Sequence, residues 1–208
     1  MERDLPAAKR GGLPPEQTGN AIFILGDPPA FDPWFAELAI APILLAPIRE
    51  LLGTEEIRYH FGNVTLKQPR VGSGISWHRD FPNRYLCPQS SSFLRVMICL
   101  DGMTRENGAT QFLRDSHHLT DAEAVTASAA RDAAASHARI DIAECPPGSA
   151  VFIHPKSVHG GPPNPSPHPR RNLIFQWGRA DDPVTVPPDT SESLAGFSIA
   201  EIEEWLRR

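Results

Sequence analysis

The chain has 208 residues and a formal net charge of −5; 40% of its residues are hydrophobic and 22% are charged. This length suffices for one well-buried core, and the composition is typical of a globular protein. The acidic balance argues against a nucleic-acid partner, because phosphate binding normally requires a basic surplus. Residues 1–20 are polar and rich in Pro and Gly, so we expect a flexible N-terminal segment before a single domain over residues 21–208.

Three features bear on where the protein works. The longest apolar run, residues 38–48, is too short to span a membrane and contains two prolines. The polar start of the chain has no apolar signal core, which predicts a cytoplasmic protein without a membrane partner. The three cysteines are odd in number and lack Cys-x-x-Cys spacing, so we expect reduced packing thiols rather than disulfides or a structural zinc site.

Residues 31–53 predict one or two helices near the start of the domain. Asp32 is placed as an N-cap, and Gly53 ends the pattern. Pro42 and Pro47 are expected to break the segment, because proline lacks the amide that a helix interior needs.

From Glu56 the apolar period changes to two, which indicates strands. Further strand candidates, separated by turn signals, are residues 92–100, 108–113, 139–144, 149–154 and 172–178. This pattern is typical of an antiparallel sandwich or barrel rather than of βαβ units. The alanine-rich stretch 121–139 predicts a helical excursion or a lid, with disorder as the alternative. Ser198 and Glu201 form a capping box that begins a short C-terminal helix.

The stretch SWHRDFPN, residues 76–83, places His78 and Asp80 one residue apart. If residues 75–81 are extended, both side chains point to the same side, although a strand end or a bend would also arrange this. An imidazole and a carboxylate so placed supply two ligands for a divalent metal. A third histidine would complete the facial triad of non-haem Fe(II) oxygenases. Taken alone, the pattern more often marks a surface salt bridge.

The downstream segment offers the missing ligand, with His154, His159 and His168 as candidates and two arginines shortly after. Here the chain resembles the phytanoyl-CoA dioxygenase family of Fe(II)/2-oxoglutarate enzymes. That family has a Trp-His-x-Asp element, then a His-Gly element leading, through an Asn and a Ser or Thr, to an Arg eleven residues after the His. The matching residues are Trp77, His78 and Asp80, and then His159, Gly160, Asn164, Ser166 and Arg170.

A third stretch, NGATQFLRDSH at residues 107–117, resembles the family's NG…GSH element, with Asp115 in place of the usual glycine. The resemblance implies a mainly β fold, a double-stranded β-helix or jelly-roll barrel with a few flanking helices and the metal at its open mouth. The strand pattern agrees with this fold.

The resemblance also implies the site. Fe(II) would be held by His78, Asp80 and His159, since only His159 has an arginine at the family spacing. Arg170 would grip the distal carboxylate of 2-oxoglutarate, which a planar guanidinium binds through two parallel hydrogen bonds. Arg171 is interpreted as a surface charge, because strand alternation turns one of the two inward. The remaining residues expected around 2-oxoglutarate are Lys67, Thr65, Asn63 and Ser166.

The implied reaction consumes 2-oxoglutarate and O2, releases succinate and CO2, and hydroxylates an unactivated C–H bond of a small soluble metabolite, for example a carboxylate or an amino-acid derivative. The presence of Asp80 favours hydroxylation over halogenation, because related halogenases have a small residue there. Residues expected near the substrate are Trp77, Phe81, Arg84, Arg95, Gln111 and Trp177.

Two other readings stay open from the residues. A zinc-dependent hydrolase or isomerase would use the same ligands, but has no need of Arg170. A non-catalytic jelly roll that binds a ligand would be expected to have lost part of the triad. The short stretch before His78 suits a small soluble substrate, or a site completed by the second subunit of a homodimer.

Overall fold

The computed structural model of the protein describes residues 10–11, 22–70, 74–82, 88–132, 139–184 and 192–208. The strands are β1 (Arg10–Gly11), β2 (Ile22–Gly26), β3 (Ile57–Lys67), β4 (Ile75–His78), β5 (Phe93–Cys99), β6 (Gln111–Leu113), β7 (Ile140–Ile142), β8 (Ser149–Ile153), β9 (His159–Gly161) and β10 (Arg170–Arg179). The helices are α2 (Trp34–Ala39), α3 (Pro42–Leu52), α4 (Asp121–Asp132) and α5 (Ile199–Leu206), with short 3-10 turns η2 (Pro28–Ala30) and η3 (Ser116–His118).

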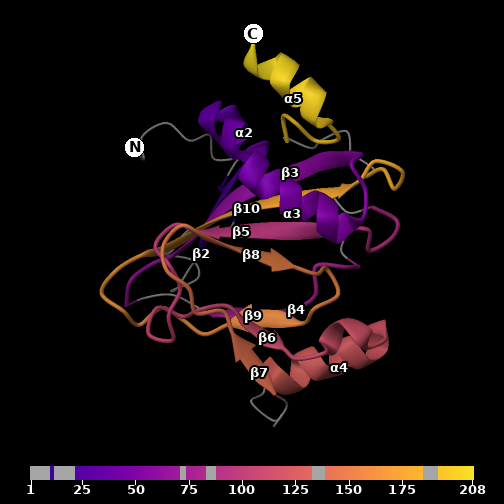
Figure 1. Ribbon diagram of the computed structural model, residues 1–208. Coiled ribbons are helices and arrows are strands. Elements are labelled where there is room, and N and C mark those ends of the chain that lie inside the picture. Colours follow the sequence, from indigo (N-terminus) through magenta and orange to yellow (C-terminus); the bar gives the residue numbers. More distant parts are fainter. Residues whose placement is uncertain (1–9, 12–21, 71–73, 83–87, 133–138, 185–191) are drawn as a thin grey trace.

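The strands form two antiparallel sheets, which confirms the mainly β prediction. The larger sheet has the order β1-β2-β3-β10-β5-β8, and the smaller has the order β4-β9-β6-β7. The small sheet lies beneath the large one in Figure 1, with α4 beside it. The arrangement is an open jelly roll, because no strand pairing joins the two sheets within the described part of the chain. Strands β1, β2 and β9 were not predicted from the sequence.

The helix ends follow local chemistry. The N-cap of α2 is Pro33 and not the predicted Asp32, although the Asp32 carboxylate accepts a hydrogen bond from the Trp34 amide at 2.9 Å. Gly53 ends α3 in the left-handed region with φ of 67°. The predicted capping box is confirmed: the Ser198 side chain accepts from the Glu201 amide, and the Glu201 side chain accepts from the Ser198 amide. None of the described helices is long and apolar enough to cross a membrane.

The two prolines of the first helical segment behave differently. Pro42 separates α2 from α3 and starts the second helix, whereas Pro47 lies inside α3 without ending it. The predicted break at Pro47 is therefore wrong. An internal proline costs about 3 kcal/mol, but Leu44, Leu45 and Ile48 are all buried, and burial of each such side chain contributes about 1.5–3 kcal/mol. Packing outweighs the lost hydrogen bond.

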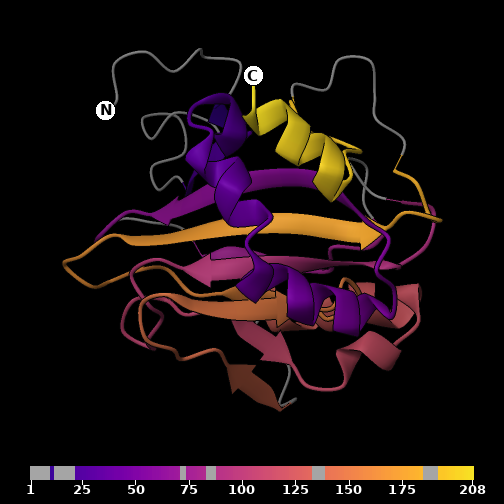
Figure 2. The same cartoon turned by 45° about the horizontal axis from the view of Figure 1, so that its top comes forward.

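The two faces of the large sheet have different partners. Helices α2, α3 and α5 cover the outer face (Figure 2), where apolar side chains of β3, β5 and β10 form the main core with them. The inner face, turned toward the small sheet, carries a smaller apolar cluster around Met97, Met103 and Ile153. It also carries buried polar side chains, among them Lys67, Arg95, Arg170, Asn172 and Gln176. The candidate site lies between this inner face and the small sheet.

Candidate metal centre

Strands β4 and β9 bring two of the predicted ligands together. His78 and His159 are direct cross-strand partners, and their ring centroids are 4.4 Å apart. Strand β4 ends at His78, so the strand end that the sequence left open as an alternative, and not a continuous strand to Phe81, arranges the pair. Instead, the amides of Asp80 and Phe81 both donate to the Pro155 carbonyl at 3.0 Å. This turn swings the Asp80 carboxylate toward the two imidazoles.

The three side chains form a compact donor set. One ligand atom from each of His78, Asp80 and His159 lies within 4.8 Å of the others. The Nε2 atoms of His78 and His159 are 3.8 and 3.9 Å from the Asp80 carboxylate oxygens. Asp80 is fully buried and the His159 side chain nearly so, whereas 39% of the His78 side chain is exposed. Two imidazoles and one carboxylate are the donors of the Fe(II) facial triad.

Backbone carbonyls set the orientation of both imidazoles. His78 Nδ1 lies 2.8 Å from the Ser76 carbonyl, and His159 Nδ1 lies 3.0 Å from the Ser157 carbonyl. A carbonyl accepts but does not donate, so each Nδ1 carries the proton and each Nε2 lone pair faces Asp80. Burial lowers the pKa of His159, which favours the neutral imidazole that a metal requires. The residues therefore fit a divalent metal ion.

Gly160 allows the close approach of the two strands. A Cβ at this position would lie 2.8 Å from the Ile75 carbonyl oxygen and 3.2 Å from the Trp77 backbone. Real Cβ atoms essentially never come so close to backbone. The His-Gly element therefore has a geometric reason: a side chain at Gly160 would push β4 away from β9 and separate the histidines.

The donor set opens into a cavity of about 250 Å³ between the two sheets. Its lining residues are Ile24, Asn63, Thr65, Ile75, His78, Arg95, Met97, Thr110, Ile153, His159, Gly160 and Ile174. Asn63 and Thr65 were predicted near the cosubstrate, and both lie on its wall. Phe112 stacks on the His159 ring with centroids 5.7 Å apart, and so fixes that imidazole from the small sheet.

A buried cationic pair lies on the inner face of the large sheet, beyond Thr65. Lys67 and Arg170 are cross-strand partners on β3 and β10, and they are 0% and 1% exposed. Lys67 Nζ donates to the carbonyls of Gly108 at 3.1 Å and Pro162 at 2.5 Å, and Arg170 donates to the same Gly108 carbonyl at 3.1 Å. Arg170 Nε has no hydrogen-bond partner within the described residues.

Burial lowers the pKa of both cations. Burial, followed by the charge of Arg170, lowers the pKa of Lys67 to about 7. Burial likewise lowers the pKa of Arg170 to about 10. No carboxylate of the chain neutralises the pair by an ion pair within the described residues. Two buried cations with an unused guanidinium N–H are suited to an anionic ligand.

Comparison with known proteins bears on this arrangement. The model of the family "Phytanoyl-CoA dioxygenase (PhyH)" matches residues 27–172, more than half of the chain. The chain belongs to the phytanoyl-CoA dioxygenase family. Among curated proteins, it is similar to a probable alpha-ketoglutarate-dependent hypophosphite dioxygenase of Stutzerimonas stutzeri, with 28% identity over 144 residues, which are 64% of this chain and 49% of the relative. It thus spans about half the length of that relative.

A second curated relative is the L-proline trans-4-hydroxylase of Streptomyces griseoviridis, 26% identical over 191 residues, which cover 79% of this chain and 70% of the relative. Among solved structures, EctD from S. alaskensis with bound Fe has a TM-score of 0.71 at 23% identity, covering 88% of this chain and 65% of that one. The carbocyclase SnoK from nogalamycin biosynthesis has a TM-score of 0.70 at 16% identity, covering 88% and 79%. These structures show a shared fold.

Arg170 and Arg171 face opposite sides of β10, as strand alternation predicted. Arg170 points inward, whereas Arg171 is exposed and pairs with Asp101 through contacts of 2.5 and 2.9 Å. Ser166, predicted near the cosubstrate, instead donates to Asn164 Oδ1 at 2.7 Å in the loop between β9 and β10. Asn164 in turn donates to the Lys67 carbonyl at 3.2 Å. Both residues therefore shape the loop, and neither lines the cavity.

The predicted substrate residues divide into two groups. Trp77 borders a second hollow of about 340 Å³ between β4 and α4, which His78 also lines, and Phe81 packs near Phe93 beside the metal ligands. Arg95 lies on the cavity wall. Arg84 lies outside the described residues.

Two of the predicted substrate residues face away from the cavity. Trp177 is fully buried in the core on the helix-covered face of the large sheet, so it cannot reach a ligand between the sheets. Gln111 lies between Thr110, which lines the cavity, and Phe112, so strand alternation turns it to the opposite side. Neither residue is placed to contact a substrate in this cavity.

Asn172 is a cavity-side residue that the sequence reading missed. It lies two residues after Arg170 on β10, is 1% exposed, and its Oδ1 has no hydrogen-bond partner within the described residues. Its Nδ2 contacts the sulfur of Met97 at 3.0 Å. The alternation that placed Arg170 inward would have placed Asn172 inward as well.

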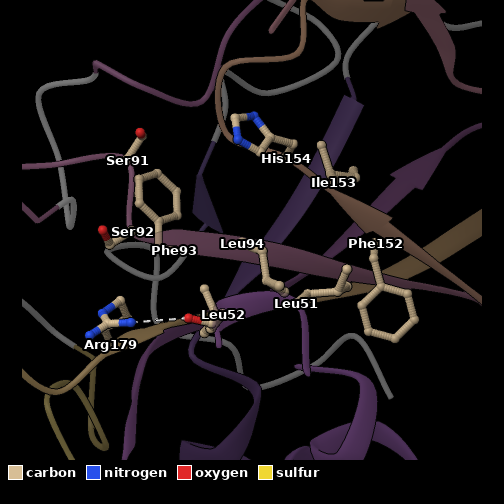
Figure 3. Close-up of a pocket in the computed structure, with 10 residues that line it drawn as sticks. All are labelled: Leu51, Leu52, Ser91, Ser92, Phe93, Leu94, Phe152, Ile153, His154 and Arg179. Carbon is tan, nitrogen blue, oxygen red and sulfur yellow. Dashed lines mark hydrogen bonds between the residues drawn. The ribbon is translucent and has the colours of Figure 1, made fainter. Parts of the chain in front are cut away.

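A larger hollow of about 450 Å³ lies outside the two-sheet core. Figure 3 shows it between the end of α3, the start of β5 and the end of β8. His154, an alternative third ligand, lines this hollow and not the metal centre. Arg179 is the cation beside it, and that guanidinium is occupied by Asp181 and the Leu52 carbonyl. This hollow has no cluster of metal-binding donors among its described lining residues.

Proposed function

We propose that the protein is an Fe(II)- and 2-oxoglutarate-dependent dioxygenase that hydroxylates a small soluble metabolite. One observation carries this proposal: a His-Asp-His donor set on the small sheet lies opposite the inner face of the large sheet, which carries a buried Lys–Arg pair. Between them, Thr65 pairs with Asn172 and Asn63 pairs with Ile174. Thr65, Asn63 and Ile174 line the cavity together with His78 and His159, and the Lys67–Arg170 pair lies two residues further along β3 and β10.

His78, Asp80 and His159 would hold Fe(II). They supply two neutral imidazoles and one carboxylate, which leaves further coordination positions open for ligands. Fe(II) and 2-oxoglutarate, when bound, supply the O2-dependent chemistry that yields succinate, CO2 and hydroxylated product. The chain's own contribution is to hold the Nε2 atoms in place through Ser76 and Ser157, and to enclose the centre between two sheets.

Arg170 and Lys67 would bind the distal carboxylate of 2-oxoglutarate. The free Nε of Arg170 and the ammonium of Lys67 supply charge-assisted donors in a buried place, where such bonds are strongest. A carboxylate would also neutralise two cations that now repel each other. The Gly108 carbonyl accepts a hydrogen bond from Lys67 and from Arg170, and so fixes the position of the two side chains relative to each other.

The substrate is proposed to be small, and a carboxylate or amino-acid derivative is the favoured class. The cavity of about 250 Å³ leaves little room beside a bound cosubstrate, and the hollow under α4 would admit the substrate next to His78. The names of the two curated relatives, a hypophosphite dioxygenase and an L-proline hydroxylase, support small substrates. Asp80 at the ligand position favours hydroxylation.

The test is an anaerobic titration of the metal-free protein with Fe(II) and then with 2-oxoglutarate. A weak visible absorption band, which arises when a 2-oxo acid chelates Fe(II), is expected to appear and saturate. Candidate amino acids and carboxylates are then screened by succinate release under O2. Iron binding without the band would contradict the oxygenase proposal and favour a zinc-type or binding-only role.

A further inference from the structure

The Asp80 carboxylate is held by a buried arginine. Arg95 on β5 places its NH1 atom 2.5 Å from Asp80 Oδ1, and the two side chains are 9% and 0% exposed. The guanidinium also lies over the Phe61 ring, with its Cζ 5.2 Å from the centroid. Arg95, which was predicted to contact the substrate, therefore already contacts two groups of the protein, the Asp80 carboxylate and the Phe61 ring.

The contact continues into a buried chain of polar side chains. Arg95 Nε donates to Gln176 Oε1 at 3.1 Å, and Gln176 Nε2 lies 3.0 Å from His60 Nδ1. Gln176 and His60 are 0% and 1% exposed. Since Oε1 accepts from Arg95, the amide nitrogen faces His60 and donates to Nδ1. Burial lowers the pKa of His60 to about 4, which keeps this ring neutral and able to accept.

A bulge in β3 places His60 in this chain. Gln176 pairs with Phe61 and Trp177 with Tyr59, so His60 is the extra residue on the β3 side. A bulge re-aims the side chain of its extra residue. Gly178 on β10 leaves the space for the ring, because a Cβ there would lie 2.4 Å from His60 Cε1. The bulge in β3 and the glycine at position 178 therefore both allow the contact between His60 and Gln176.

We propose that Arg95 is a positioning residue for the metal ligand Asp80, and that Gln176 and His60 act through it. This inference rests on the proposed function, because it assumes that His78, Asp80 and His159 bind a metal. Arg95 holds the Asp80 carboxylate through its Oδ1 atom. It also keeps a fully buried carboxylate compensated before the metal arrives, so the donor set is preformed. Gln176 fixes the plane of the guanidinium and His60 fixes Gln176.

The experiment measures binding of Co(II) to the metal-free protein, without O2 or substrate. The variants are Arg95→Met, Arg95→Lys, Gln176→Leu and the double variant Arg95→Met with Gln176→Leu. Arg114→Met is the matched control, because Arg114 forms an ion pair with Asp141 on the surface. The affinity, the visible Co(II) spectrum and the metal-free melting temperature are recorded for each variant.

Loss of a group that orients a metal ligand typically weakens metal binding by about 10–100-fold. We expect a loss of this size for Arg95→Met with an altered Co(II) spectrum, a smaller loss for Gln176→Leu, and an intermediate loss for Arg95→Lys. The double variant should bind like Arg95→Met alone, because Gln176 acts through Arg95. If Arg95→Met does not fold, Gln176→Leu against Arg114→Met decides the question by its affinity and spectrum.

Two failures are distinguishable. Wild-type affinity and spectrum in Arg95→Met and Gln176→Leu would overturn the positioning role while leaving the metal centre intact. If the wild type and His159→Ala bind Co(II) equally, the metal centre itself fails, and the inference falls with the proposed function.

Discussion

His78 and His159 lie directly opposite each other on β4 and β9, with ring centroids 4.4 Å apart. Directly paired residues on neighbouring strands are close enough for their side chains to touch. The pairing register therefore decides the distance between the two nitrogen donors. A slip of one residue would turn one imidazole to the other face of the sheet. Asp80 lies next to the two histidines because the turn after β4 is fixed by hydrogen bonds from the Asp80 and Phe81 amides to the Pro155 carbonyl.

Removal of one ligand should abolish turnover. His159→Ala and Asp80→Ala are each expected to reduce Fe(II)-dependent succinate release to background, because two donors are too few for the facial triad. His154→Ala is the matched control, since this histidine lies in the outer hollow. Circular dichroism checks that the fold is intact. If either ligand variant keeps full activity, the triad is wrongly assigned.

Arg170→Ala should weaken 2-oxoglutarate binding and spare the metal. A hydrogen bond to a charged group is worth about 1.5–3 kcal/mol, which corresponds to about 10–100-fold in affinity. Arg171→Ala is the control on the same strand, because its guanidinium pairs with Asp101 at the surface. Calorimetry of Fe(II) binding, and then of 2-oxoglutarate binding to the anaerobic Fe(II) form, gives the metal affinity and the 2-oxoglutarate affinity of each variant. An unchanged 2-oxoglutarate affinity in Arg170→Ala would move the carboxylate site elsewhere.

Binding of 2-oxoglutarate should depend on pH through Lys67. In the free protein burial lowers the pKa of Lys67 to about 7, so the ammonium is charged below this pH and largely neutral above it. A bound carboxylate favours the charged form and raises the pKa. Above about pH 7, binding must therefore take up a proton, and affinity falls as pH rises, by up to tenfold per unit.

Calorimetry in two buffers of different ionisation enthalpy measures this proton uptake. Lys67→Met should bind more weakly and show no uptake from this site. A wild-type protein that binds 2-oxoglutarate with the same affinity and no proton uptake from pH 6 to 9 (a range chosen to bracket the pKa of about 7) would contradict the assigned role of Lys67.

Gly160→Ala should weaken metal binding although it adds one methyl group. The new Cβ would lie 2.8 Å from the Ile75 carbonyl, so β9 must move away from β4 and carry His159 with it. Gly26→Ala is the control, because its nearest contact beyond the chain neighbours is 3.9 Å. Co(II) titration of both variants should show a loss for Gly160→Ala alone. Equal affinities would mean that the strand pair tolerates the shift.

The sequence alone determined the features that depend on local spacing. Covalent geometry alternates side chains along a strand, so Arg170 and Arg171 had to face opposite ways, and the structure places them so. The same parity, counted from Arg170, turns Trp177 outward and Asn172 inward. The capping box at Ser198 is equally local, because both of its hydrogen bonds lie within one turn.

Tertiary structure decided what depends on contacts between distant segments. The three-residue strand β9 has too little pattern of its own and exists through its pairing with β4 and β6. Pro47 stays helical because α3 packs on the sheet. Arg95 faces the cavity by alternation, but its partner was set only when the turn after β4 brought Asp80 to it. Periodicity fixes the face of a side chain; register and packing fix what it meets there.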